Sequence, residues 1–233
     1  MKNLLNACIV FLFITSSAFA QCTDINTNEI ATYLNQKVKP RLDIKLDRTD
    51  GFVAISGTRQ NLDLKDIKVS PIKREWTYFF ENVRRADSNF WYDSNKNSFI
   101  LDVKFENNGI EIKGRCEGCL TSRMKDDRAP DIQWRAPQIL RFTLKPITFQ
   151  RSVSFTVENV EMLGKLEGNG LARVIQKITR NVEYLISEEL KRVFDTDVTK
   201  RLFNDALRPL LESKNTVSAN SVSLASTSLR VCE

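Results

Sequence analysis

Residues 169–211 decide the fold, and their sequence is NGLARVIQKITRNVEYLISEELKRVFDTDVTKRLFNDALRPLL. Apolar residues recur in its first half at steps of three and four, which places them on one stripe of an α-helix. The charged residues fall mostly outside that stripe. The stripe consists of Leu171, Val174, Ile175, Ile178, Val182, Leu185, Ile186, Leu190 and Val193. A long helix with one apolar stripe needs an apolar partner surface, and the rest of the chain indicates that this partner is a sheet.

The second half of the stretch predicts a break and another helix. The Asp-Thr-Asp run at 195–197 interrupts the periodic pattern and offers side chains that can cap the next helix. Apolar residues then repeat at four-residue steps from Val198 to Leu210. Pro209 indicates a kink or a boundary near the end of this helix.

Most of the chain before residue 169 predicts β-strands. An exception is a short helix that we expect to begin at Asn26, with Glu29 completing a variant of the capping box, and to end before Pro40. Apolar alternation with a period of two then predicts strands at 42–46, 52–54, 62–64, 67–69, 99–105, 110–112, 139–149 and 153–157.

Four other segments carry weaker or more specific predictions. The Asn-Asn-Gly turn at 107–109 predicts that the strands on either side of it form a hairpin. Residues 73–93 are rich in aromatic side chains and fit a helix and a strand equally well, whereas residues 121–137 are polar and predict a loop. Residues 222–231 predict a final strand that returns to the sheet.

The N-terminus predicts a targeting segment at residues 1–20. Lys2 precedes an apolar run at 4–13 that is too short to span a bilayer, and Ala18-Phe19-Ala20 matches a small-x-small cleavage site. Cys22 raises the alternative of a lipoprotein, but Gln21 departs from the residues that usually precede a lipidated cysteine. We expect a periplasmic or secreted protein that is soluble once the segment is removed, with a single domain at residues 21–233.

Composition narrows the classes of partner. The chain has 35 basic and 29 acidic residues, and the loss of the one lysine in the targeting segment leaves a mature charge of about +5. These charges are spread out, with no block of one sign, so the sequence does not predict nucleic-acid binding. Four cysteines remain in an oxidising compartment, which predicts disulfides. Of three pairings, we favour Cys116–Cys119 as a local bridge and Cys22–Cys232 between the chain ends.

The order of elements resembles a module of the tubular lipid-binding (TULIP) superfamily, such as one domain of bactericidal/permeability-increasing protein. The resemblance covers most of the mature chain as a pattern of elements and rests on no invariant motif. It is most specific at residues 181–194, NVEYLISEELKRVF, together with the helix that follows them. One departure is that the long helix has no cysteine, whereas host-defence members tie this helix to a strand by a disulfide.

The resemblance implies an α+β fold in which a long, strongly bent antiparallel sheet wraps a long amphipathic helix. It also implies non-enzymatic binding of a lipid or another elongated apolar ligand between the two layers, with transient membrane contact. Each buried methylene of such a ligand would contribute about 0.8 kcal/mol. The candidate lining is Leu101, Val103, Phe142, Leu144, Phe155, Val157, Leu171, Val174, Ile178, Val182, Leu185 and Ile186. The competing interpretation is that the same residues form a closed core.

Catalytic and metal chemistry have little support in the sequence. The chain contains no histidine, which excludes histidine-based triads, histidine general bases and histidine zinc ligands. We predict no catalytic residues, no metal and no cofactor. One alternative is a disulfide oxidoreductase that uses Cys116 and Cys119, although the pair follows a strand and no helix begins behind it. The other alternative is a structural or protein-binding component of the cell envelope, for which the sequence names no partner.

Overall fold

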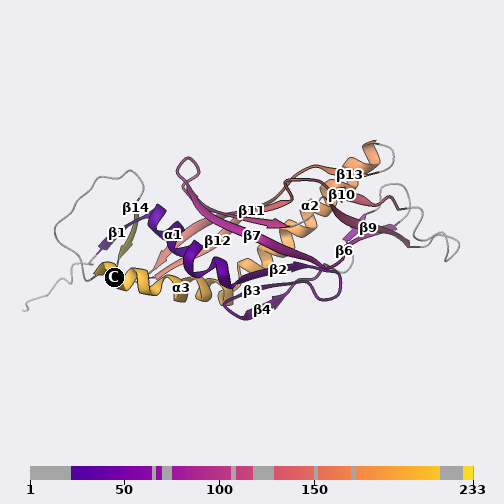
Figure 1. The fold of residues 1–233 in the computed structure, drawn as a ribbon. Helices are drawn as coiled ribbons and strands as arrows, with labels where there is room; N and C mark the ends of the chain where they lie inside the picture. Colours follow the sequence, from indigo (N-terminus) through magenta and orange to yellow (C-terminus); the bar gives the residue numbers. More distant parts are fainter. Residues whose placement is uncertain are drawn as a thin grey trace, which may run out of the picture.

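The structure is a computed structural model that describes residues 22–64, 67–69, 75–105, 109–117, 129–149, 152–168, 172–215 and 228–232. These residues form an α+β body that is elongated in Figure 1. Its helices are α1 (Thr27–Lys37), α2 (Ala172–Phe194) and α3 (Asp197–Asn215), with a short 3-10 helix at Lys39–Arg41. The described strands fall into three sheets, and all of their pairings are antiparallel.

The largest sheet has seven strands in the order β12-β11-β8-β7-β2-β3-β4 and is strongly curled, like half of a barrel. Along most of β12, buried side chains alternate with half-buried ones, as a strand with one apolar face requires, whereas the first four residues of β8 are all buried. Their bounds are β2 (Leu42–Leu46), β3 (Phe52–Ile55), β4 (Thr58–Asn61), β7 (Val83–Asp93), β8 (Ser98–Phe105), β11 (Ile139–Phe149) and β12 (Ser152–Leu163).

Two smaller sheets lie at opposite ends of the body (Figure 1). A five-stranded sheet in the order β13-β10-β9-β6-β5 lies near the N-terminal half of α2. At the other end, the first and last described strands pair in a two-stranded sheet, next to α1 and α3. The bounds are β5 (Ile67–Val69), β6 (Glu75–Phe80), β9 (Ile110–Glu117), β10 (Ile132–Trp134), β13 (Leu166–Gly168), β1 (Cys22–Asn26) and β14 (Ser228–Cys232).

The helices lie where the sequence predicts them, with two differences in detail. Asn26 caps α1 by accepting a hydrogen bond from the Asn28 backbone N–H at 2.8 Å, but Glu29 forms an ion pair with Lys214 of α3 instead of closing a capping box. Thr196 caps α3, because its Oγ1 accepts from the Thr199 backbone N–H at 3.3 Å. Pro209 lies inside α3, which continues to Asn215.

Several strand predictions need correction. Residues 75–93 are strands β6 and β7, which settles the helix-or-strand ambiguity for that part of the chain. The predicted hairpin across 107–109 is wrong, because β8 pairs with β7 and β11 whereas β9 pairs with β6 and β10 in another sheet. Alternation identifies a strand and its buried face but not its partner, which is why the pairing could not be predicted.

Three further segments differ from expectation. Residues 62–64 have no strand conformation, and the strand in that region is β4. A short strand, β10, forms inside the predicted polar loop, although residues 121–128 lie outside the described part of the chain. The final strand pairs with β1 and not with a larger sheet, and residues 222–224 also lie outside the described residues.

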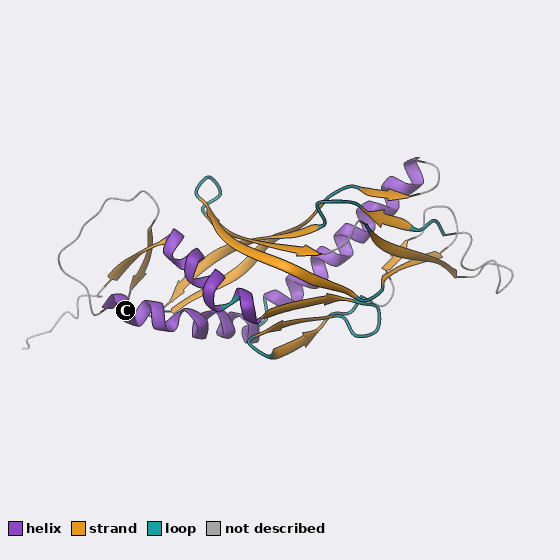
Figure 2. Ribbon diagram, viewed as in Figure 1, coloured by secondary structure: helices purple, strands orange, loops and turns teal. Residues whose placement is uncertain are grey.

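The second half of α2 and the corner after it, at residues 195 and 196, are held between the two edge strands of the seven-stranded sheet (helices purple and strands orange in Figure 2). On the β12 side, the Ser187 hydroxyl donates to the Val160 carbonyl at 2.8 Å, and the Val157 N–H donates to the Asp195 carboxylate at 3.0 Å. On the β4 side, the Thr196 hydroxyl donates to the Gln60 side chain at 2.9 Å. The helix therefore closes the open side of the curled sheet and satisfies polar groups at both edges.

The β4 edge has further contacts with the same helix. The Asp63 N–H donates to the Glu189 carboxylate at 2.5 Å, and the Arg192 guanidinium donates to the Asn61 carbonyl at 3.4 Å. Arg192 also pairs with Glu189 at 2.6 Å, so one ion pair of α2 holds the segment that follows β4.

Candidate functional site

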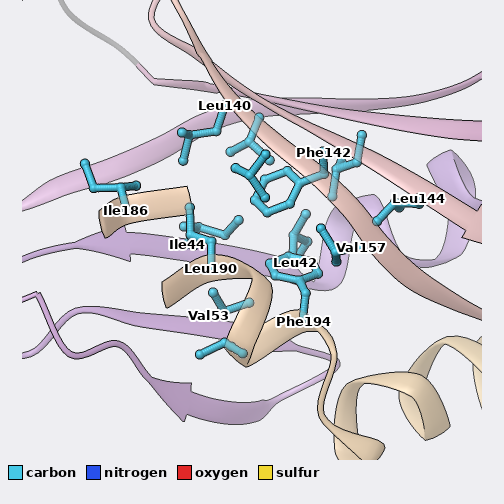
Figure 3. Packing of buried hydrophobic residues seen from close by; sticks show 14 of the residues in the cluster. Leu42, Ile44, Val53, Leu140, Phe142, Leu144, Val157, Ile186, Leu190 and Phe194 are labelled. Atoms are coloured by element: carbon cyan, nitrogen blue, oxygen red, sulfur yellow. The ribbon is translucent and has the colours of Figure 1, made fainter. Parts of the chain in front are cut away.

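The predicted ligand-lining residues lie mainly in a closed core. Nine of the twelve are at most 8% exposed. They come from α2 and from the strands of the curled sheet, and Figure 3 shows some of them converging from both layers. The nine are Leu101, Val103, Phe142, Leu144, Phe155, Val157, Ile178, Val182 and Ile186. The closed-core interpretation therefore describes the region where α2 packs against the curled sheet, which we call the closed half. A ligand role for these nine residues stays a prediction.

The other three predicted lining residues differ from this pattern. Leu185 is 38% exposed and lies on the outer side of α2, beside Leu64 and Ile67 in a shallow surface hollow. Leu171 and the side chain of Val174 lie outside what the structure describes. Leu185 follows the three- and four-residue spacing of the stripe, but it falls at the edge of that stripe, where a helix leaves the core.

Aromatic contacts show how tightly the two layers meet in the closed half. The rings of Phe142 on β11 and Phe194 on α2 have centroids 4.5 Å apart. Phe155 on β12 contacts Phe99 on β8 of the same sheet and Phe203 on α3 edge-on, with centroid distances of 5.3 Å in both pairs. Such contacts are typical of a closely packed protein interior.

An open cavity borders the N-terminal half of α2 instead. We call it the sheet-end cavity, and its volume is about 850 Å³. It lies where strands of the five-stranded sheet meet the first turns of the helix. Its lining residues are Glu111, Asp131, Gln133, Arg135, Lys165, Leu166, Glu167, Gly168, Ile175, Gln176 and Thr179. This volume lies within the range of about 300–1,000 Å³ that is usual for small-molecule sites.

The apolar part of the sheet-end cavity continues the buried stripe of α2. Ile175 lies near the N-terminal end of that stripe and is 9% exposed. Ile178, about one turn further along the helix, is fully buried. A Cβ atom on Gly168 would lie 2.8 Å from Cδ1 of Ile175, so a larger residue here would require the end of the Ile175 side chain to move. Leu166 adds a half-buried apolar side chain from the same strand, β13.

The polar part of the cavity contains an ion-pair network around Glu167 and a hydrogen-bonded aspartate, Asp131. Glu167 accepts from Lys165 at 2.7 Å and from Arg135 at 3.3 Å, and these bonds lower the pKa of the Glu167 carboxyl. Asp131 accepts a hydrogen bond from the Gly114 backbone N–H at 2.8 Å. The cavity thus offers hydrogen-bonding groups around an apolar wall, which suits a ligand with a polar head and an apolar chain.

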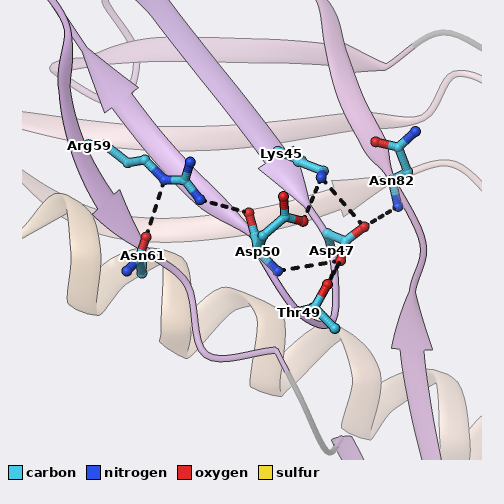
Figure 4. Close-up of polar contacts among 7 residues, drawn as sticks. All are labelled: Lys45, Asp47, Thr49, Asp50, Arg59, Asn61 and Asn82. Carbon is cyan, nitrogen blue, oxygen red and sulfur yellow. Dashed lines mark hydrogen bonds and ion pairs between the residues drawn. The ribbon is translucent and has the colours of Figure 1, made fainter.

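A second polar cluster has a structural role. Asp47, at the end of β2, accepts hydrogen bonds from the backbone N–H groups of Thr49, Asp50 and Asn82 (Figure 4). Burial raises the pKa of Asp47, but these bonds and one from the Thr49 hydroxyl outweigh burial and hold the pKa well below its usual range. Lys45 is only 6% exposed and pairs with Asp50 at 2.5 Å and with Asp47 at 3.8 Å.

The Asp47 cluster joins two turns of the fold, and its polar groups bond to one another. Asp47 fixes the turn between β2 and β3 and also the turn before β7, where Asn82 has a positive φ. Within the described residues, no group of three or more acidic or cysteine side chains could hold a metal ion.

The two cysteines whose side chains the structure describes differ in exposure, because Cys22 is exposed and Cys116 is buried. Cys116 is completely buried and disulfide-bonded, and Cys22 is also disulfide-bonded. A buried cysteine is a poor partner for thiol exchange. Cys119 lies outside the described residues, whereas the backbone of Cys232 is opposite Cys22 in the β1–β14 ladder. Both predicted pairings stay predictions, and the β1–β14 register favours the one between Cys22 and Cys232.

Sequence reasoning missed the sheet-end cavity for a physical reason. Its lining comes from four separate parts of the chain, which are β9, the residues in and beside β10, the residues in and beside β13, and the start of α2, and no local motif links them. Gly168 is the last residue of β13, and only the three-dimensional structure shows that Ile175 packs against it.

Comparisons with protein-family models, with curated proteins and with solved structures give no match to this chain. Among the residues that the structure describes, no helix is long and apolar enough to cross a membrane.

Proposed function

We propose that this protein binds a lipid-like amphiphile in the sheet-end cavity, without a catalytic step. The observation that carries the proposal is the position of the cavity at the point where the apolar stripe of α2 leaves the closed core. The apolar chain of the ligand would lie against Leu166 and Ile175, and its polar head would face the charged rim. This site replaces the slot between α2 and the curled sheet as the place where we expect the ligand.

The TULIP resemblance supports the same class of function. In that superfamily a bent antiparallel sheet wraps a long helix and holds acyl chains beside it. Here the hydrogen bonds between α2 and both edge strands, from Ser187 to β12 and from Arg192 to β4, are consistent with a wrapped helix, and the cavity at its N-terminal half offers space beside it. Export to the periplasm or the extracellular space, as the targeting segment predicts, would place the protein beside membranes that supply such ligands.

The size of the cavity is compatible with useful affinity. Each methylene that leaves water contributes about 0.8 kcal/mol, so even a part of an acyl chain against Leu166 and Ile175 gives a driving force of several kcal/mol. Some of that gain is offset by the ordering of the ligand and of rim side chains such as Lys165.

A cavity-filling variant tests the proposal. Gln176 is exposed and lines the cavity, so Gln176→Trp should occupy the space and reduce the uptake of a fluorescent fatty-acid probe by about tenfold or more. Tyr184→Trp is the matched control, because Tyr184 is 63% exposed on the same helix and does not line the cavity. Native mass spectrometry of the purified protein, before and after denaturing extraction, would identify a ligand that copurifies.

The proposal fails if the unmodified protein takes up no probe, or if both tryptophan variants lose uptake equally. A protein that carries no ligand and captures one protein partner would instead favour a structural or protein-binding role. The closed half of the interior is the observation that supports this second candidate, because a solid core such as that around Phe142 and Phe194 needs no ligand.

A further inference from the structure

A second, smaller cavity lies between β12 and α3. We call it the α3 cleft, and its volume is about 360 Å³. Two serines of β12 form one wall, and one face of α3 forms the other, with residues at positions i, i+3, i+4 and i+7. Its lining residues are Ser152, Ser154, Asp197, Lys200, Arg201 and Asn204.

The two cations of the α3 cleft differ from most other cations on the two C-terminal helices. Within the described residues, Lys200 has no carboxylate within ion-pair distance, and the Arg201 guanidinium donates to the backbone carbonyl of Asp197 at 3.3 Å. By contrast, Lys191 pairs with Glu188, Arg192 with Glu189, Arg208 with Asp205 and Lys214 with Glu29. The cleft therefore has two cations against the single carboxylate of Asp197, so its net charge is positive.

Exposed apolar side chains flank the same cleft. Ile147 is 41% exposed and lies directly opposite Ser154 in the β11–β12 ladder, on the same face of the sheet. Val198 is 38% exposed and lies on α3 between Asp197 and Arg201, one turn before the arginine. These are two of the four large apolar side chains that are exposed among the described residues.

We propose that the α3 cleft docks on a membrane surface that contains anionic phospholipids. Lys200 and Arg201 would contact lipid phosphates, and the neutral donors Ser154 and Asn204 would add hydrogen bonds. Ile147 and Val198 would enter the boundary between head groups and acyl chains. A small soluble anion would use the cations but would leave both apolar side chains in water, and so the pairing of charge with apolar surface favours a bilayer.

Vesicle cosedimentation tests this proposal. The mature protein should bind phosphatidylcholine vesicles that contain phosphatidylglycerol and should not bind pure phosphatidylcholine vesicles. The double variant Lys200→Gln/Arg201→Gln should bind the anionic vesicles roughly thirty-fold more weakly, since each basic residue at such a surface contributes a factor of about five. Added salt should weaken the unmodified protein more than the double variant, because exposed charges are screened.

A matched control separates the cleft from net charge. Lys96 and Lys104 are exposed lysines in the β7–β8 hairpin. Among the described residues, no carboxylate lies within ion-pair distance of either lysine. Lys96→Gln/Lys104→Gln removes the same charge and should bind anionic vesicles as the unmodified protein does. Ile147→Thr, which keeps a β-branched residue, should weaken vesicle binding without changing its salt dependence. Circular dichroism of each variant checks that it is folded.

Three results would overturn the proposal. The protein could bind neutral and anionic vesicles equally well, or the two double variants could lose vesicle binding equally. The protein could also bind inorganic phosphate tightly but bind no vesicles. The last result would identify a site for a soluble anion. Because fatty-acid uptake depends on the sheet-end cavity and vesicle binding on the α3 cleft, either proposal can fail without the other.

Discussion

The two halves of α2 have the same kind of apolar stripe but different surroundings. The C-terminal half, from Val182 to Phe194, is enclosed because both edge strands of the curled sheet hydrogen-bond to it or to the corner that follows it. The N-terminal half lies beside the short strands of the five-stranded sheet, and there Ile175 borders the sheet-end cavity. The difference shows that a helix stripe predicts burial, whereas the reach of the neighbouring sheet decides whether burial leaves a cavity.

The largest effect on stability should come from truncating buried side chains, and it should differ between the two halves of α2. Phe194→Ala removes a ring that packs against Phe142, and we expect it to reduce the free energy of unfolding by about 3–5 kcal/mol. Ile175→Ala at the cavity should cost about 2 kcal/mol, because part of its surface already faces open space. Urea denaturation of both variants measures the difference. Equal losses would mean that the two halves are packed alike.

The next effect concerns the polar cluster beside the closed half. Asp47→Asn weakens the hydrogen bonds to three backbone N–H groups and removes one of the two carboxylates near the buried Lys45. We expect a loss of about 2–3 kcal/mol at neutral pH, measured by urea denaturation. No comparable buried charge is present in the sheet-end cavity, where the charged residues are at least partly exposed.

The same variant should change the dependence of stability on pH. The pKa of Asp47 is lower in the folded than in the unfolded protein, so its contribution is present above the ordinary carboxyl pKa and is lost as the pH falls toward the folded-state value. The unmodified protein should therefore lose more stability on acidification than Asp47→Asn does. Parallel acid-induced unfolding curves would contradict this expectation.

The smallest effect tests the edge contact itself. Ser187→Ala removes the hydrogen bond to the Val160 carbonyl, and we expect it to cost about 1 kcal/mol. Thr179→Ala, in the cavity half, removes a hydroxyl that donates to the Gln176 carbonyl of the same helix, and it should change stability by less than about 0.5 kcal/mol. Thermal unfolding compares them, and a larger loss for Thr179→Ala would show that the β12 edge contact does not hold the helix.

The sequence predicted the elements better than their connections. The side chains of Asn26 and Thr196 cap α1 and α3, as expected for these residue types, so the starts of both helices could be predicted from the sequence. The partners of β8 and β9 were not, because the turn residues at 107–109 indicate only a change of direction, whereas pairing depends on which edges other strands leave free.

The candidate site was harder to predict than the fold. Periodicity placed Ile178, Val182 and Ile186 on the buried face correctly, but it could not distinguish a slot from a closed core. Leu185 shows the same limit at one position, since a step of three or four residues does not define the width of the buried stripe. The residues of the sheet-end cavity and the α3 cleft are polar and dispersed, and they become sites only because strands and helices bring them together.

The closure of the curled sheet by α2 also has a consequence for the order of folding. All seven strands of that sheet precede Ala172 in the chain. Because the chain is synthesised from its N-terminus, β4 and β12 are open edges before the helix is available. Open edges can pair with other chains and lead to aggregation. The last quarter of the sequence, from α2 onward, therefore protects a sheet that the preceding part has already encoded. A chain that stops before α2 would be prone to association through both edges.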